Sequence, residues 1–189
     1  MDDFQSLVGR LLVAMPGISD PRFEHAVILV CAHEPDHAMG LRLDRPAPGV
    51  DLKDVLTKLK TEAPDTTAHR AVLIGGPVER ERGFVLHTDD WLIDDASMAL
   101  GQGLAMTGTR EALIAMTDPV AGPRRSVLLL GYAGWGEGQL DDELGENVWI
   151  TTEGDADLIF DTDYDAKWSR ALGTLGIDPA RLSGQSGRA

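Results

Sequence analysis

Apolar residues follow two patterns along the chain, and short apolar runs bounded by turn residues are the commoner one. Runs of this kind, rich in Val, Ile and Leu, are typical of strands buried in a sheet. Strands of this type are predicted in HAVILVCAH (25–33), RAVLIGG (70–76), GFVLHT (83–88), RSVLLLGYAG (125–134), NVWIT (147–151) and DADLIFD (155–161). A further apolar run, RLLVAM (10–15), stops at a Pro-Gly turn pair.

Two pairs of segments lie close enough in the sequence to form hairpins. AMGLRLDRP (38–46) alternates apolar with small or polar residues, which predicts a half-exposed strand that pairs with 25–33 and stops at Pro46. SMALGQGLAMT (97–107) carries Gly-Gln-Gly at its centre and predicts a tight hairpin. The charges of VERER (78–82) alternate, and this segment is predicted to be a solvated turn.

Helical spacing of apolar residues is the second pattern. Leu residues at 52, 56 and 59, with Val55, predict an amphipathic helix over 51–60 that Asp51 caps. Further helices are predicted over 110–117 with Thr109 as the cap, over 139–144, and over 167–175 with Asp163 or Asp165 as the cap. Strands outnumber helices and do not alternate with them regularly, so the fold class predicted is α+β.

The composition narrows the class of protein. A chain of 189 residues fits a single domain (1–189), and it shows no repeat or second-domain boundary. The linker TEAPDTTAH (61–69) is predicted to be mobile and the tail 183–189 to be disordered.

With 17 basic and 31 acidic residues, the net charge of −14 repels nucleic acid and anionic membranes, so neither is an expected partner. One cysteine and the lack of a signal peptide or long apolar run predict a cytoplasmic protein.

The stretch GYAGWGEGQLDDE (131–143) invites comparison with phosphate-binding loops. Its glycines match neither nucleotide-binding pattern, no Lys or Arg lies between Arg125 and Lys167, and its acids occupy the place of a phosphate. We therefore expect no nucleotide and no other cofactor. Two alternatives stay open: a structural loop, or a binding loop walled by Tyr132 and Trp135.

Catalytic and metal sites have weaker signals. Cys31 and His33 are two apart on a strand and are expected to face the same side, where a thiolate–imidazole pair is conceivable. The competing interpretation is that Cys31 is a small buried hydrophobe. Pro35 prevents His33 and His37 from sharing a regular helix, and DTDYDA (161–166) lacks the Gly of a calcium loop, so no metal is expected.

Several of these segments together resemble the AlgH/YqgE family of bacterial proteins, most of which have no assigned biochemistry. The matching segments are LLVAMPGISDPRFEHAVILVCAH, AMGLRLDRP, GGPVERERGFVLH, LGYAGWGEGQLDDEL, NVWI, ADLIFD, KWSRALGTLGID and LSGQSGRA. Glu137, Asp141 and Asp44 depart from the family pattern, which weakens any transfer of chemistry to these positions. The resemblance implies a branched, largely antiparallel sheet curled into a partial barrel with helices outside. It also brings the label of a transcriptional regulator, given to one member for its effect on gene expression.

The sequence thus predicts a non-enzymatic binding or regulatory domain that acts through an unknown protein partner or small ligand. Scattered arginine pairs and the absence of a helix-turn-helix pattern disfavour direct contact with DNA. The candidate cleft comprises Gly76, Pro77, His87, Tyr132, Trp135, Gln139, Glu143 and Asn147. Replacing Trp135 with Ala is expected to abolish ligand capture and to leave the fold intact. The alternative is a small hydrolase that uses His87 with Glu143, or Cys31.

Overall fold

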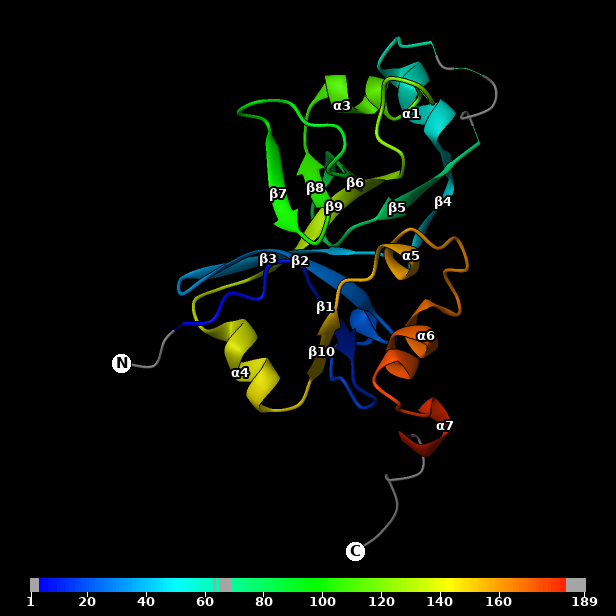
Figure 1. The fold of residues 1–189 in the computed structure, drawn as a ribbon. Helices are drawn as coiled ribbons and strands as arrows, with labels where there is room; N and C mark the ends of the chain where they lie inside the picture. Colours follow the sequence, from blue (N-terminus) through cyan, green and yellow to red (C-terminus); the bar gives the residue numbers. More distant parts are fainter. Residues whose placement is uncertain (1–3, 63, 65–68, 183–189) are drawn as a thin grey trace, which may run out of the picture.

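The computed structural model describes residues 4–62, 64 and 69–182, and its central element is the long strand β9 (Ser126–Trp135) (Figure 1). This strand has three neighbours: β5 (Ala71–Ile74) in parallel, and β6 (Val78–Thr88) and β3 (His37–Arg42) antiparallel. A strand with three neighbours makes the sheet branch. The first half of β9 lies in the upper part of Figure 1 and the second half in the lower part.

The other strands extend the sheet on both sides of β9, and most of the pairs are antiparallel. The main path runs β10 (Trp149–Glu153), β1 (Arg10–Ala14), β2 (Val27–Glu34), β3, β9, β6, β8 (Leu104–Thr107) and β7 (Ser97–Gly101), while β4 (Pro46–Asp51) pairs with β5. The predicted α+β fold, with a branched and largely antiparallel sheet curled into a partial barrel and helices outside, is confirmed.

The helices are short and lie around the sheet (Figure 1). They are α1 (Leu52–Lys58) and α3 (Arg110–Ala115) on the upper part, α4 (Gln139–Gly145) on one side of the lower part, and α5 (Ala156–Ile159), α6 (Lys167–Thr174) and α7 (Pro179–Leu182) on the other, with a 3₁₀ turn at Pro21–Phe23. Every helix of the described ranges is too short or too polar to cross a bilayer.

The core is divided by the sheet because the strand β2 is buried on both faces. Val27 and Leu29 belong to one cluster of buried residues, whereas Ile28 and Val30 belong to another, beneath α4. This burial explains why the sequence of β2 is a continuous apolar run rather than an alternating one. A third cluster lies beneath α1 and α3 in the upper part.

The two predicted hairpins and most of the predicted helix caps are confirmed. The pairs β2–β3 and β7–β8 are hairpins, and the backbone from Gly101 to Gly103 has positive φ throughout. Asp51 and Asp54 form a capping box at α1. The predicted tail 183–189 and much of the predicted linker lie outside the described residues.

Four local predictions are wrong. VERER belongs to β6, at an irregularity in its pairing with β9, so it is exposed without being a turn. DADLIFD contains the helix α5, because Asp155 accepts a hydrogen bond from the amide of Asp157 and starts a helical turn. The cap residue of α6 is Ala166, and Asp163 accepts a hydrogen bond from its amide. The supposedly exposed face of β3 is also buried, where Arg42 forms an ion pair with Asp44.

The N-cap of α3 provides a test of how this helix is held against the upper sheet. The Thr109 hydroxyl accepts a hydrogen bond from the amide of Ala112 at the start of the helix, and Ala112 and Leu113 pack into the third cluster. We expect Thr109→Ala to lower the free energy of unfolding by about 1 kcal/mol, because the amide loses its acceptor. Urea denaturation measures this, and Thr109→Ser serves as the control that keeps the acceptor. An equal loss in both variants would contradict the capping role.

Candidate functional site

Trp135 is a buried member of a hydrogen-bonded cluster in which Glu143 is half-buried and Gln139 is exposed, so its ring does not form the open wall of a cleft. The segment GYAGW is the second half of β9, in which residues 133–135 pair with β3, and Trp135 is 6% exposed. Its indole Nε1 donates a hydrogen bond to Oε2 of Glu143 over 2.9 Å, and the indole of Trp149 donates to the same oxygen over 2.7 Å. Gln139 donates to Oε1 of Glu143 over 2.8 Å. The Glu143 carboxylate therefore joins β9, α4 and β10.

Other residues of the predicted cleft take part in packing or in turns of the backbone. Gly76 lies against β9 so closely that a Cβ atom there would be 2.0 Å from the carbonyl carbon of Tyr132. The ring of Tyr132 meets Phe84 edge to face at 6.2 Å. Asn147 has a φ of +59° in the turn after α4, and its amide bonds to the carbonyl of Leu144. Pro77 lies between β5 and β6.

His87 is fully buried and lies far along the sheet from Glu143. Its Nδ1 bonds to the carbonyl of Thr88 over 2.9 Å, so Nδ1 carries the proton and Nε2 accepts from the Thr107 hydroxyl over 2.8 Å. Burial lowers its pKa and keeps the ring neutral. His87 pairs with Ser126, at the opposite end of β9 from Trp135, roughly 30 Å of extended chain away. The predicted convergence of His87 with Glu143 is therefore wrong.

Cys31 and His33 do not form a catalytic pair. A bulge between Val30 and Ala32 shifts the register of β2, so the two side chains lie on opposite faces of the sheet. Cys31 packs in the first cluster, while His33 faces Asp141 of α4 at 3.6 Å. Burial raises the pKa of the Cys31 thiol to about 12, so the thiolate is scarce at neutral pH. The prediction that they share a face is wrong because of the bulge.

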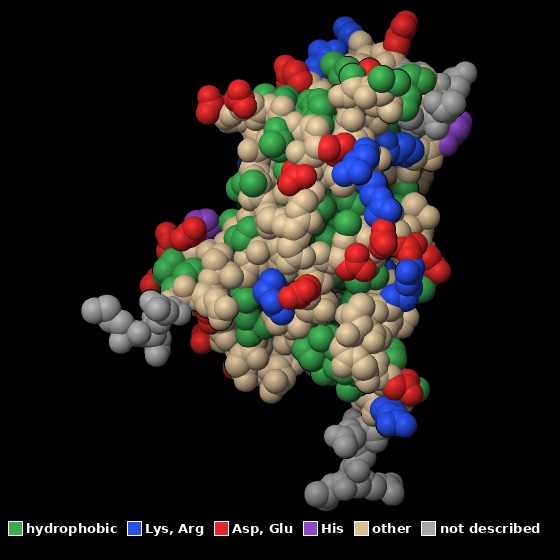
Figure 2. All heavy atoms as spheres, viewed as in Figure 1, with side chains coloured by type: hydrophobic (Ala, Val, Ile, Leu, Met, Phe, Trp, Pro, Cys, Tyr) green, Lys and Arg blue, Asp and Glu red, His purple; other side chains and the backbone are tan. Residues whose placement is uncertain are grey.

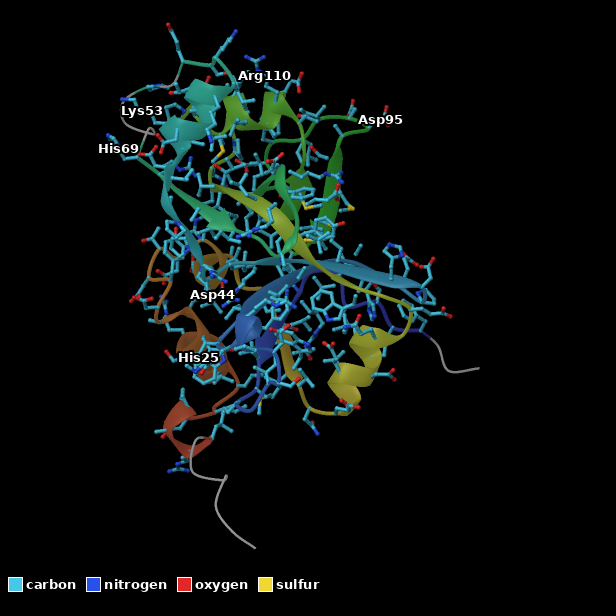
Figure 3. The ribbon with its side chains drawn as sticks, turned by 180° about the vertical axis from the view of Figure 1, so that it is seen from behind. His25, Asp44, Lys53, His69, Asp95 and Arg110 are labelled. Atoms are coloured by element: carbon cyan, nitrogen blue, oxygen red, sulfur yellow. The ribbon has the colours of Figure 1, made fainter. Side chains whose placement is uncertain are left out.

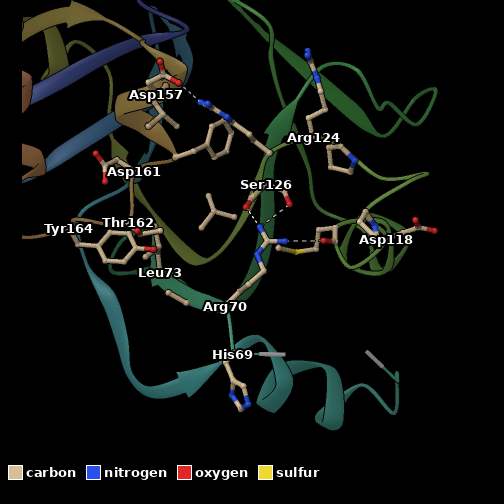
Figure 4. Close-up of a pocket in the computed structure, with 18 residues that line it drawn as sticks. His69, Arg70, Leu73, Asp118, Arg124, Ser126, Asp157, Asp161, Thr162 and Tyr164 are labelled. Atoms are coloured by element: carbon tan, nitrogen blue, oxygen red, sulfur yellow. Dashed lines mark hydrogen bonds and ion pairs between the residues drawn. The ribbon is translucent and has the colours of Figure 1, made fainter. Parts of the chain in front are cut away.

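A groove of about 860 Å³ opens on a different part of the molecule, between the upper part of the sheet and the segment from α5 to α6 (Figure 4). Arg70 lies at its centre. β5 runs parallel to β9 with Val72 opposite Leu128, which places Arg70 beside Ser126. Its guanidinium donates from Nη1 to the carbonyl of Met116 over 2.9 Å, and from Nη2 to the carbonyl and hydroxyl oxygens of Ser126. These bonds tie the end of α3 to the start of β9.

The rim of the groove carries paired charges. Arg125, which directly precedes β9, forms an ion pair of 2.6 Å with Asp157 of α5 across the groove. Arg124 pairs with Asp90 at 3.3 Å outside it. Asp161 pairs with Arg170 of α6. Figure 2 shows basic side chains gathered on this face, with acidic side chains just below them.

Arg70 differs from the rim arginines in its partners. Its hydrogen bonds go to neutral oxygens, and among the described residues no carboxylate lies within 4 Å of it. Burial lowers its pKa, but an arginine side chain stays charged at neutral pH. The hydroxyl of Tyr164, whose pKa burial raises, also lines the groove. The groove thus contains a half-buried positive charge that the described part of the protein leaves without a counter-ion.

Sequence reasoning missed this groove because three distant segments build it, around residues 69–73, 116–127 and 157–164. In the sequence, Arg124 and Arg125 form one of the scattered arginine pairs, and Arg70 is the first residue of a predicted strand. A charged residue directly before a buried strand does not by itself indicate a binding site. The parallel pairing of β5 with β9, which places Arg70 beside Ser126, is not visible in the sequence.

Comparison with known proteins gives a consistent family assignment. The family model described as AlgH-like matches residues 11–180. A UPF0301 protein of Caulobacter vibrioides is 51% identical over 188 residues, covering 100% of this chain and 96% of the relative. A UPF0301 protein of Paracoccus denitrificans is 45% identical, with all of both chains covered.

Two solved structures share the fold. The solution structure of the AlgH protein from Pseudomonas aeruginosa has a TM-score of 0.78 and 38% identity, covering 98% of this chain and 100% of the other. A crystal structure of a Corynebacterium diphtheriae protein has a TM-score of 0.73 at 21% identity, covering 100% of this chain and 95% of the other, and its likeness concerns the fold alone. The matched family model and these relatives show that the chain belongs to the AlgH-like, UPF0301 family.

Proposed function

We propose that this protein is a non-enzymatic binding domain of the cytoplasm, which recognises a small ligand or a short partner segment in the groove around Arg70. The observation that carries the proposal is the half-buried guanidinium of Arg70, whose hydrogen bonds go to neutral oxygens. A volume of about 860 Å³ falls within the range of small-molecule sites in proteins. The groove replaces the cleft around Trp135 as the proposed site.

The geometry supports binding better than the hydrolase alternative. Both ring nitrogens of His87 are engaged inside the core, and the Cys31 thiol is buried with a pKa of about 12. Glu143 accepts hydrogen bonds from two indoles and one amide. None of these three groups is available to attack a substrate in the described structure.

A regulatory role would then be indirect. The net charge of −14 opposes the approach to DNA, and the groove rim carries Asp118, Asp157 and Asp161 beside its arginines. A ligand or partner held in the groove gives the protein a way to influence gene expression without touching nucleic acid.

The experiment is a fragment screen on ¹⁵N-labelled protein, followed by ¹H–¹⁵N correlation spectra. We expect fragments to shift the backbone amides of Ala71, Val127 and Thr162, which lie in the groove, and to leave the Trp135 indole signal in place. Shifts centred on Trp135 and Tyr132, or no shift with any fragment, would contradict the proposal. Turnover of a substrate that is lost in His87→Ala or Cys31→Ala would contradict the non-enzymatic role.

A further inference from the structure

We infer that the groove recognises a ligand with one carboxylate and an apolar body, and that Arg70 binds the carboxylate. This inference rests on the proposed function, because it names the class of ligand for the same groove. Three features carry it: the N–H donors of Arg70 that have no partner among the described residues, the apolar part of the groove lining, and the aspartates that lie beside the paired arginines of the rim.

Some N–H groups of Arg70 have no acceptor among the described residues. A guanidinium carries five N–H groups, and the three hydrogen bonds of Arg70 are made by Nη1 and Nη2. Its Nε donates to no oxygen of the described residues. The bonds to Met116 and Ser126 hold the planar group in one orientation in advance, so a ligand does not have to order it. The N–H groups of Arg70 that remain, on Nε and Nη1, can each donate a charge-assisted hydrogen bond to a carboxylate oxygen.

About half of the residues that line the groove around Arg70 are apolar. Side chains from β5, from the segment after α3, from β9 and from α5 line the groove, and they include Leu73, Met116, Pro119, Val127, Ile159 and Phe160. Tyr164 and Thr162 add hydroxyl groups on the side of α6 (Figure 4). A ligand that contacts these walls needs an aliphatic or aromatic body.

The rim selects against ligands with several negative charges. Asp118, Asp157 and Asp161 line the same groove, and each rim arginine already has a carboxylate partner within 4 Å. Asp161 is paired with Arg170 of α6. Phosphate esters and polyphosphates would meet these aspartates as well as Arg70, and a monocarboxylate would meet them with the least repulsion.

The test compares ligands that share a phenyl ring and differ in the polar group attached to it. Phenylacetate and its neutral isostere phenylacetamide are titrated into the wild-type protein at constant ionic strength, with phenyl phosphate as the third probe. We expect phenylacetate to shift the groove amides and to bind about tenfold or more tightly than either of the other two. Equal binding of phenylacetate and phenylacetamide would overturn the carboxylate inference but leave the groove as a binding site. Tighter binding of phenyl phosphate would overturn the preference for one charge.

A matched pair of variants isolates Arg70. Arg110 also donates to a carbonyl and a hydroxyl, those of Leu59 and Thr61, but it lies at the top of the upper part, away from the groove (Figure 3). Arg70→Gln and Arg110→Gln therefore remove the same charge and the same kinds of hydrogen bond. We expect about a tenfold loss of phenylacetate affinity in Arg70→Gln and less than twofold in Arg110→Gln. Equal losses would overturn the inference.

The comparison of ligands on the wild-type protein decides the question even if Arg70→Gln folds poorly. In that case Arg70→Lys, which keeps the charge, is expected to retain part of the preference for phenylacetate over phenylacetamide. If the neutral fragments of the screen also fail to bind the groove, the proposed function fails as well; if they bind and phenylacetate shows no advantage, only the ligand class fails.

Discussion

Trp135→Ala is expected to lower the free energy of unfolding by about 3 to 5 kcal/mol, the range for truncation of a buried tryptophan. The variant removes a ring that packs edge to face on Trp149 at 6.1 Å, and it removes one of the three donors to Glu143. It should therefore weaken the fold, in contrast to the expectation from the sequence that it would affect only ligand capture. Urea denaturation followed by far-UV circular dichroism measures the effect without depending on the lost fluorophore.

The contribution of the hydrogen bond can be separated from that of the ring. Trp135→Phe keeps a buried aromatic group and removes the indole N–H, so its loss should be smaller, while Glu143 keeps Trp149 and Gln139 as donors. Leu92→Ala, at a side chain that is 54% exposed, is the control and should change the stability by less than about 0.5 kcal/mol. A Trp135→Ala variant as stable as this control would show that the cluster around Glu143 is not structural.

The glycine-rich stretch 131–143 was expected to be a structural or binding loop, but Gly131 to Trp135 belong to β9, in agreement with the strand predicted over 125–134. Glycine has a low strand propensity, so local sequence favours a turn after the run of leucines. The pairing of β9 with β3 overrides this preference. The two strands approach closely there, because a Cβ atom at Gly40 of β3 would lie 2.5 Å from Cγ2 of Ile28 and 3.3 Å from the ring of Trp135. Gly131 has a φ of +74° at the point where the strand passes from one part of the sheet to the other. Such long-range pairing cannot be seen in a single sequence.

Features set by neighbouring residues were predicted well. Caps at Asp51 and Thr109 and the Gly-Gln-Gly hairpin depend on residues at most a few positions apart. The run DADLIFD failed because an apolar segment this short has no clear period of two or 3.6 residues. The groove was not predicted for another reason: the hydrogen-bond partners of Arg70, Met116 and Ser126, are 46 and 56 positions away in the sequence.

Lys167 is the clearest case of a residue whose environment the sequence conceals. At the start of an amphipathic helix, a lysine is expected to face the solvent, yet this side chain is 1% exposed. Its Nζ donates to the carbonyl of Ile159 over 2.8 Å and lies 5.3 Å from the centre of the Tyr164 ring. Burial lowers its pKa to about 8, and the nearby charge of Asp44 opposes that shift.

This environment predicts a rise in stability at alkaline pH. Below pH 8 the lysine is charged in both the folded and the unfolded protein, so the cost of burying the charge is fully present. Between pH 8 and its unfolded value of 10.5, the unfolded chain binds more protons than the folded one, and the free energy of unfolding increases with pH. A shift of this size corresponds to a gain on the order of 3 kcal/mol across that window.

The gain should disappear in Lys167→Met, which fills similar space without a titrating group. The difference in unfolding free energy between wild type and Lys167→Met, measured by urea denaturation from pH 7 to pH 10, should therefore move in favour of the wild type as the pH rises. Other titrating groups cancel in this difference. Lys53→Met, at an exposed lysine of α1, should give a flat difference. A flat line for Lys167→Met as well would mean that the ammonium group is as well solvated in the folded protein as in the unfolded chain, and its burial would then not set its pKa.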